Sequence, residues 1–187
     1  MNIVKLFNEI SHSTPDTSRC LKNLKRMQKM HPDFLEKNIP FLSNIAMLYA
    51  CSQFLSDYSI IKPESLSSAL KEIDSPVSKN QIIEDYKNSE KNLYGYDYKK
   101  QCLKILRIFK KDYLLRITLR DLTGKIGTEE STYELSVLAD ALIEIVLNMS
   151  LRLMKDNFGE LKDDSFTILG LGKLGAEDLN YSSDIDI

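Results

Sequence analysis

The chain has 187 residues, 43% of them hydrophobic and 28% charged, which is the balance of an ordinary globular protein. Its net charge of −2 excludes a global basic field of the kind that attracts nucleic acid or anionic membranes. No apolar run approaches the roughly 20 residues of a membrane span, and the first residues lack the apolar core of a secretory leader. We therefore expect neither nucleic acid nor a membrane as a partner.

Residues 1–70 predict a series of short helices. The second helix opens at Pro15 and Asp16 and ends at His31, because the residue before a proline disfavours the helical conformation. Its outward face is strongly basic and either contacts an acidic partner or is simply solvated. The apolar face of the first helix comprises Ile3, Leu6, Phe7 and Ile10, and the basic face of the second comprises Arg19, Lys22, Lys25, Arg26 and Lys29.

A further helix is expected from about Leu42, and Ser52 is a suitable N-cap for the one after it. Residues 71–98 are polar and loop-like, with a Tyr-Gly-Tyr at 94–96, and we interpret them as a hinge that includes a short helical pattern around Ile82 and Tyr86.

The three cysteines, Cys20, Cys51 and Cys102, are too far apart for a metal motif, and each lies among apolar neighbours. An odd number of cysteines without a leader is typical of a reducing compartment. The pattern predicts buried free thiols in a cytoplasmic protein.

Residues 98–122 show a strong helical pattern, which Gly124 and Gly127 would end. Its basic residues, Arg116 and Arg120 among them, either snorkel along a packed surface or approach nucleotide phosphates or a protein substrate. A long helix should follow, capped by Thr128 and running to about residue 157, with one wide apolar face.

Residues 166–187 carry the chemistry. A short apolar run at 166–169 is typical of a buried strand, and glycines at Gly170, Gly172 and Gly175 let the backbone turn sharply and approach a ligand. A second strand is expected at 184–187. Because strand side chains alternate between faces, Asp184 and Asp186 should share one face.

Two neighbouring carboxylates repel each other unless a cation lies between them, and such oxygen ligands suit Mg²⁺ or Mn²⁺ shared with a phosphate. Together with Ser183, the pattern predicts a metal-phosphate site. A Rossmann site is excluded because only residues 176–181 separate the last glycine from the serines, too few for a crossover helix. A Walker loop is excluded because leucine follows Lys173.

The combination of Gly-x-Gly-Lys-Leu-Gly at 170–175, Asp-Leu-Asn-Tyr at 178–181 and Ser-Ser-Asp-Ile-Asp at 182–186 resembles the glutamine synthetase adenylyltransferases. These two-headed enzymes are a divergent branch of the polymerase β-like nucleotidyltransferases. Three earlier segments are similar to the family in the same order: 48–66, with Ser-x-Phe-Leu and Pro-Glu-x-Leu; 106–122, with Arg-Ile-x-x-Arg-Asp-Leu; and 134–142.

The resemblance implies a mainly α fold: a helical domain over residues 1–160, then the beginning of a polymerase β-like α+β nucleotidyltransferase domain over 161–187, truncated at its end. It implies catalytic and metal-binding roles for Asp184 and Asp186. The resemblance also implies that phosphate or nucleotide is bound by Gly170, Gly172, Lys173 and Ser183. ATP, ADP and phosphate would be substrates or products.

By resemblance to the N-terminal head, the chain would remove AMP from a tyrosine of glutamine synthetase by metal-dependent phosphorolysis, yielding ADP, under control of the PII signalling protein. The family also needs a third carboxylate from a later strand, so we expect the chain as given to be an inactive fragment. The alternative is a non-catalytic helical docking module that binds glutamine synthetase or PII.

Overall fold

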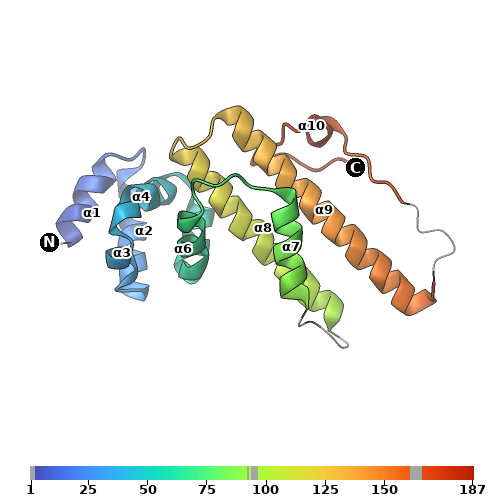
Figure 1. Cartoon of the computed structure of the whole chain (residues 1–187). Coiled ribbons are helices and arrows are strands. Elements are labelled where there is room, and N and C mark those ends of the chain that lie inside the picture. Colours follow the sequence, from blue (N-terminus) through green and yellow to red (C-terminus); the bar gives the residue numbers. More distant parts are fainter. Residues whose placement is uncertain (1–2, 92, 94–96, 161–165) are drawn as a thin grey trace. The chain divides into compact units, whose positions relative to one another are not determined.

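The computed structural model describes residues 3–91, 93, 97–160 and 166–187, and within these ranges it is helical, without a strand. The chain divides into two compact units (Figure 1). Unit 1 comprises Met1–Ser75 and Leu115–Gly127, and unit 2 comprises Pro76–Leu114 and Thr128–Ile187. Helix α8 (Tyr98–Leu122) contributes its first part to unit 2 and its last part to unit 1. The expected mainly α fold is confirmed.

Unit 1 is built from short helices that follow one another closely in the chain, so its contacts are largely local. Helix α2 packs against α1 and α4, while α5 packs against α2, α4 and α6. The elements are α1 (Ile3–His12), α2 (Thr17–Met30), α3 (Phe34–Lys37), the 3-10 helix η1 (Ile39–Phe41), α4 (Leu42–Cys51), α5 (Gln53–Ile61) and α6 (Pro63–Lys71). Their fully buried side chains form the core: Phe7, Leu24, Met27, Leu35, Ile45, Leu48, Tyr49, Ile60 and Leu66.

The helix boundaries in unit 1 follow from local chemistry. The Asp16 side chain accepts a hydrogen bond from the Arg19 backbone N–H at 2.9 Å and caps α2, which ends at Met30, before Pro32. Ser52 caps α5 by accepting from the Leu55 N–H at 3.3 Å. The predicted cap at Ser52 and the predicted start of the second helix are confirmed.

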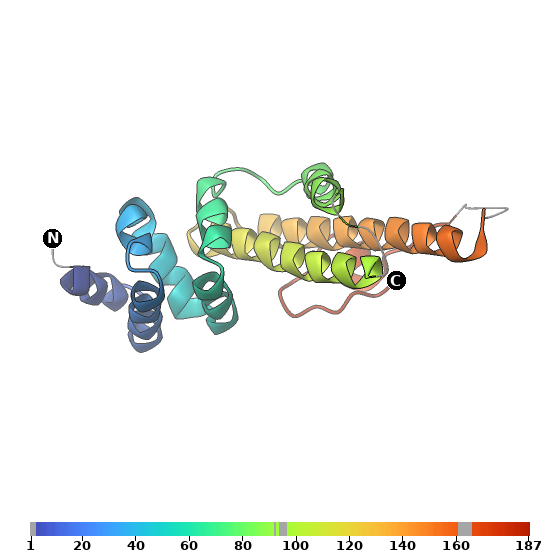
Figure 2. The same ribbon diagram turned by 90° about the horizontal axis from the view of Figure 1, so that it is seen from below.

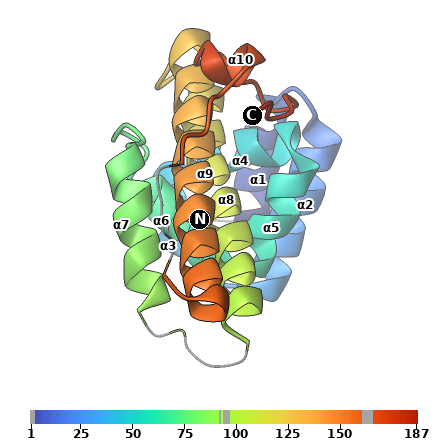
Figure 3. The same ribbon diagram turned by 90° about the vertical axis from the view of Figure 1, so that its right-hand side faces the viewer.

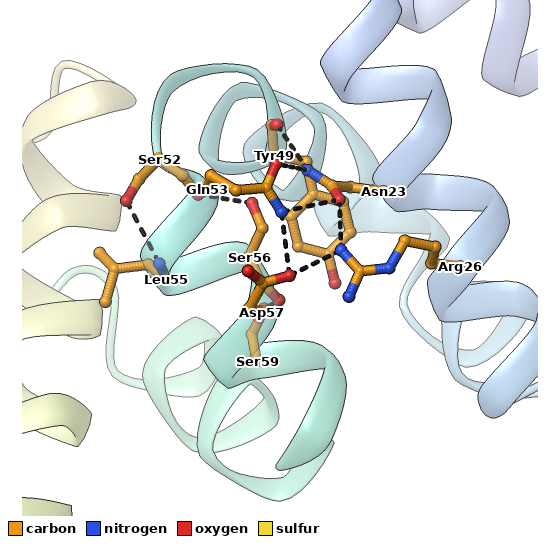
Figure 4. Close-up of polar contacts among 9 residues, drawn as sticks. All are labelled: Asn23, Arg26, Tyr49, Ser52, Gln53, Leu55, Ser56, Asp57 and Ser59. Carbon is orange, nitrogen blue, oxygen red and sulfur yellow. Dashed lines mark hydrogen bonds and ion pairs between the residues drawn. The ribbon is translucent and has the colours of Figure 1, made fainter.

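A polar network joins α2, α4 and α5 (Figure 4). The buried Asn23 donates to the Tyr49 carbonyl at 3.1 Å and to the Gln53 side chain at 3.2 Å. Arg26 donates to Asn23 at 3.0 Å and to Asp57 at 2.6 Å. A buried amide without hydrogen-bond partners would destabilise the fold. This network therefore fixes how the three helices pack.

Unit 2 consists of α7 (Lys79–Glu90), the first part of α8, α9 (Thr128–Phe158) and the single turn α10 (Gly172–Gly175). The part of α8 that belongs to this unit runs antiparallel to α9 (Figures 1 and 2). Helix α7 packs on another side of α9, as Figure 3 shows. The buried Glu134 of α9 accepts the Val77 N–H at 3.1 Å, which fixes the segment leading into α7.

Helix α8 has the predicted bounds and ends in a Schellman motif. Gly124 adopts a positive φ of 68°, the Lys125 N–H donates to the Arg120 carbonyl at 2.9 Å, and the Gly124 N–H donates to Asp121 at 3.0 Å. The predicted helix over 128–157 is confirmed as α9. The Tyr-Gly-Tyr at 94–96 and residues 161–165, at the predicted domain boundary, lie outside the described residues.

Two expectations are corrected. Cys20 and Cys102 are buried free thiols, but Cys51 is exposed. Cys51 is the last residue of α4, and apolar neighbours in the sequence do not decide which way a side chain at a helix end points. The strands expected at 166–169 and 184–187 are not formed: both stretches are irregular, and the backbone hydrogen bond from Leu171 to Asp186 starts beyond the first of them. A strand needs a ladder of such bonds along a neighbour.

Candidate functional site

The Gly170–Gly175 loop is shaped by two close approaches. Gly172 has a positive φ of 52°, and a Cβ placed on it would lie 3.2 Å from the Asp186 carboxylate oxygen Oδ2. A Cβ on Gly175 would lie 2.4 Å from the Gly170 carbonyl oxygen, closer than real atoms approach. The loop therefore requires glycine at 175 and favours it at 172. Its close contact with Asp186 brings two predicted site residues together.

The two aspartates lie in an exposed segment. The Asp186 carbonyl accepts the Leu171 N–H at 2.9 Å, which holds this end of the chain against the start of α10. Asp184 and Asp186 are both exposed, as are Gly170, Gly172 and Lys173. That both carboxylates point into one cleft with the loop stays a prediction.

Ser183 takes part in a turn that leads directly to Asp184. Its Oγ accepts the Asn180 N–H at 3.1 Å, and its own N–H donates to the Asn180 carbonyl at 3.2 Å. The Asn180 side chain in turn accepts from the Ser182 N–H at 3.0 Å. The Ser183 hydroxyl thus has a defined place beside Asp184 and keeps its proton to donate to a ligand.

The carboxylates of Asp184 and Asp186 are the type of ligand that a hard divalent cation prefers, but two of them are too few to complete its coordination. Exposed carboxylates are the oxygen ligands that Mg²⁺ and Mn²⁺ prefer. Within the described ranges, however, no three His, Cys, Asp or Glu side chains gather closely enough to hold a metal ion. Asp184 and Asp186 would have to share a cation with phosphate oxygens, water or a further ligand.

Two arginines of α8, Arg116 and Arg120, have structural partners. Arg116 is buried, pairs with the Glu72 carboxylate and donates to the Ser75 carbonyl at 2.8 Å. Arg120 is also buried and donates to the Ile73 carbonyl at 2.8 Å. These bonds, all within unit 1, support the packed-helix interpretation of the two arginines over the phosphate-binding one.

The basic face of α2 divides by residue type. Arg19 donates to the Ala50 carbonyl at 3.0 Å, and Arg26 pairs with Asp57. The other three members of the face are exposed: Lys22, Lys25 and Lys29. The two arginines therefore hold unit 1 together, and only the lysines form a solvated basic surface.

Two residues of α9 lie in the segment 134–142 that resembles the family, but no role was predicted for either. Glu134 binds the Val77 N–H, and the buried Ser136 accepts the Leu179 N–H at 3.1 Å. For Glu134 there was a signal: a carboxylate adjoining the wide apolar face of a helix must find a partner when it is buried. Ser136 gave none, because serine is common on both faces of a helix.

Comparison with known proteins agrees with the motif. The model of the family "Glutamate-ammonia ligase adenylyltransferase" matches residues 42–187. A relative from Hahella chejuensis is 31% identical over 173 residues, which cover 86% of this chain and 18% of that protein. One from Bartonella quintana is 34% identical over 160 residues, covering 81% and 16%. Both are bifunctional glutamine synthetase adenylyltransferase/adenylyl-removing enzymes. No solved structure matches the chain.

These relatives define the class as adenylyltransferases, enzymes that transfer an adenylyl group. The chain belongs to the glutamate-ammonia ligase adenylyltransferase family, since the family model matches most of its residues. The chain spans less than a fifth of the length of the two relatives. None of the described helices combines the length and the hydropathy of a membrane span.

Proposed function

We propose that the chain supplies the nucleotide-binding loop and two metal-binding carboxylates of a head that removes AMP from glutamine synthetase. In this reaction inorganic phosphate displaces the synthetase tyrosine from the AMP phosphorus, and the products are ADP and the free tyrosine. The observation that supports it best is the contact between Asp186 and Gly172, because it joins both halves of the family motif.

Asp184 and Asp186 would hold Mg²⁺ or Mn²⁺, with a third carboxylate expected from the family pattern. When bound, such a cation offsets negative charge on the phosphates and on the departing phenolate. The chain's own groups act around it. Backbone N–H groups near Gly172 and the Ser183 hydroxyl would donate to phosphate oxygens, and exposed Lys173 would add a positive charge.

The partners follow from the reaction. Glutamine synthetase is the substrate in the name of both relatives, and we infer it as the substrate here. The PII protein is the proposed regulator by resemblance to the family. A cytoplasmic location is supported by the three cysteines, none of which forms a disulfide. Nucleic acid is not proposed as a partner.

A chimaera tests this function. In the Hahella chejuensis relative, the 173 matching residues are replaced by this chain, and ADP release from adenylylated glutamine synthetase is measured with phosphate and Mg²⁺. We expect ADP release that requires both phosphate and the metal ion. A folded chimaera that binds the synthetase but releases no ADP would instead favour the helical docking module.

A further inference from the structure

The segment that carries the candidate site, residues 166–187, buries few of its side chains. Of the described residues 166–187, the two buried side chains are Leu174 at 5% exposure and Leu179 at 4%. Leu179 is the last buried residue before Asp184 and Asp186. Leu179 is therefore the buried residue nearest to the aspartates along the chain.

Leu179 is held by a buried serine of α9. The Ser136 Oγ accepts the Leu179 N–H at 3.1 Å and donates its own proton to the Thr132 carbonyl at 2.9 Å. Because the proton is directed at the helix backbone, a lone pair is left to face Leu179. The Ser136 residue is only 2% exposed, so water cannot easily replace the hydroxyl as acceptor.

The chain from Leu179 to the aspartates is short and internally bonded. The Asn180–Ser183 turn described above comes immediately after Leu179, and Asp184 immediately after the turn. At the other end, the Asp186 carbonyl accepts the Leu171 N–H. A shift at Leu179 would be passed through this turn to both carboxylates.

The geometry points to Ser136 as a positioning residue of the candidate site, acting through Leu179 and the 180–183 turn to place Ser183, Asp184 and Asp186 against the Gly172 loop. This role rests on the proposed function for its catalytic meaning. The structural part, that Ser136 fixes the aspartates, can be tested without any activity.

The first test compares Ser136→Ala with Ser131→Ala. Ser131 is a matched control, because it is 4% exposed on the same helix and its hydroxyl donates to the Thr128 carbonyl. Amide hydrogen exchange is followed by NMR at Leu179, which loses its acceptor, and at Leu171, which donates to Asp186. We expect Ser136→Ala to speed exchange at both amides about tenfold or more, and Ser131→Ala to change neither.

The second test uses Mn²⁺ as the probe and records paramagnetic broadening of the amide signals of residues 171–173 and 183–186. In the unmodified chain we expect saturable broadening there. Ser136→Ala should weaken the apparent Mn²⁺ affinity by about tenfold, while Ser131→Ala leaves it unchanged. Unfolding by urea, measured on both variants, separates a general loss of stability from a local one.

The proposed metal site and the positioning role of Ser136 would fail with different experimental results. Absence of Mn²⁺ broadening in the unmodified chain would count against the proposed metal site, while faster exchange at Leu171 would still support the positioning role. Unchanged exchange at Leu171 despite exposure of the Leu179 amide would overturn that role. If Ser136→Ala does not fold, Ser136→Cys fills nearly the same volume with a weaker acceptor, and the same two amides decide.

Discussion

Glycine at 175 is required by contact geometry rather than by backbone dihedral angles alone. The Gly170 carbonyl oxygen occupies the space that a side chain at 175 would need. Gly127, by contrast, would meet nothing within 4 Å if a Cβ were added, and its φ is not in the left-handed region. The two positions make a matched pair for testing the loop.

We predict that Gly175→Ala disrupts the loop, because its backbone must move to relieve the clash. The local cost should be at least about 1 kcal/mol, seen as roughly fivefold faster amide exchange at Leu171. Gly127→Ala should leave amide exchange at Leu171 unchanged, because residue 127 lies outside the loop and a Cβ there would meet nothing within 4 Å. Equal exchange rates in both variants would show that the loop is not held in this conformation.

Asp57 links stability to pH in unit 1. The hydrogen bond from Arg26 holds the pKa of the Asp57 carboxyl below its usual value of 3.8. Since the folded state favours the ionised form, the contribution of Asp57 is present above that value and is lost as the pH falls through the lowered pKa.

We therefore predict that Asp57→Asn destabilises the chain more at neutral pH than in acid. Asp57 is partly exposed, so solvent screens the pair and the difference at about pH 7 should be no more than about 1 kcal/mol. Urea unfolding at about pH 7, 5 and 3 should show the two stabilities converging at the lowest pH. A constant gap across the series would contradict the assignment.

Among the secondary-structure elements, the end of α8 is held by a buried arginine and an exposed lysine. The two residues should contribute differently to the free energy of unfolding. Arg120 is buried and donates to the Ile73 carbonyl. Lys125 forms an exposed pair with Asp74 at 2.6 Å. Removing a buried donor leaves its acceptor unsatisfied, whereas an exposed pair is replaced by water.

We predict that Arg120→Ala lowers the free energy of unfolding by about 2–4 kcal/mol, and that Lys125→Ala lowers it by less than about 1 kcal/mol. Arg120→Lys should recover only part of the loss, because an ammonium group cannot reproduce the planar donor geometry. Urea or thermal unfolding of the three variants measures this. If Arg120→Ala changes the free energy of unfolding only slightly, the structural role is wrong and a phosphate-binding role becomes the better explanation.

The helices could be predicted from the sequence because their signals are local. The periodicity of 98–122, the caps at Asp16 and Ser52 and the terminating Gly124 each depend on residues within one or two turns. The roles of Arg116 and Arg120 could not be predicted, since their partners at 72–75 are more than 40 residues away. The strands expected at 166–169 and 184–187 are not formed because an apolar or alternating pattern does not supply the neighbouring strand that a ladder needs.

At the scale of the whole molecule, the candidate site depends on residues that no single motif contains. The Gly-rich loop and Asp186 meet at Gly172, while Ser136 of α9 accepts the N–H of Leu179 and attaches the segment between them. The motif alone therefore predicted the residues of the candidate site, and the structure adds how the segment is attached to α9.

The last prediction concerns the direction of the chemistry. The relative from Hahella chejuensis is bifunctional, so attachment and removal of AMP can be measured on one chimaera. We expect Asp184→Asn or Asp186→Asn to reduce AMP removal by about 10²-fold or more, since each change replaces a charged metal ligand with a neutral amide of the same size. Attachment of AMP should be largely retained, because by resemblance to the family the other head has its own carboxylates.

The control for this prediction is Asp178→Asn, an exposed carboxylate of the same segment outside the paired aspartates. It should leave both activities within about twofold, because Asp178 is not among the predicted catalytic, metal-binding or phosphate-binding residues and its side chain is exposed. Loss of attachment with removal retained in the Asp184 and Asp186 variants would assign the chain to the opposite head. Equal loss in all three variants would mean that the segment is merely destabilised by the change of charge, and that the paired aspartates have no special role.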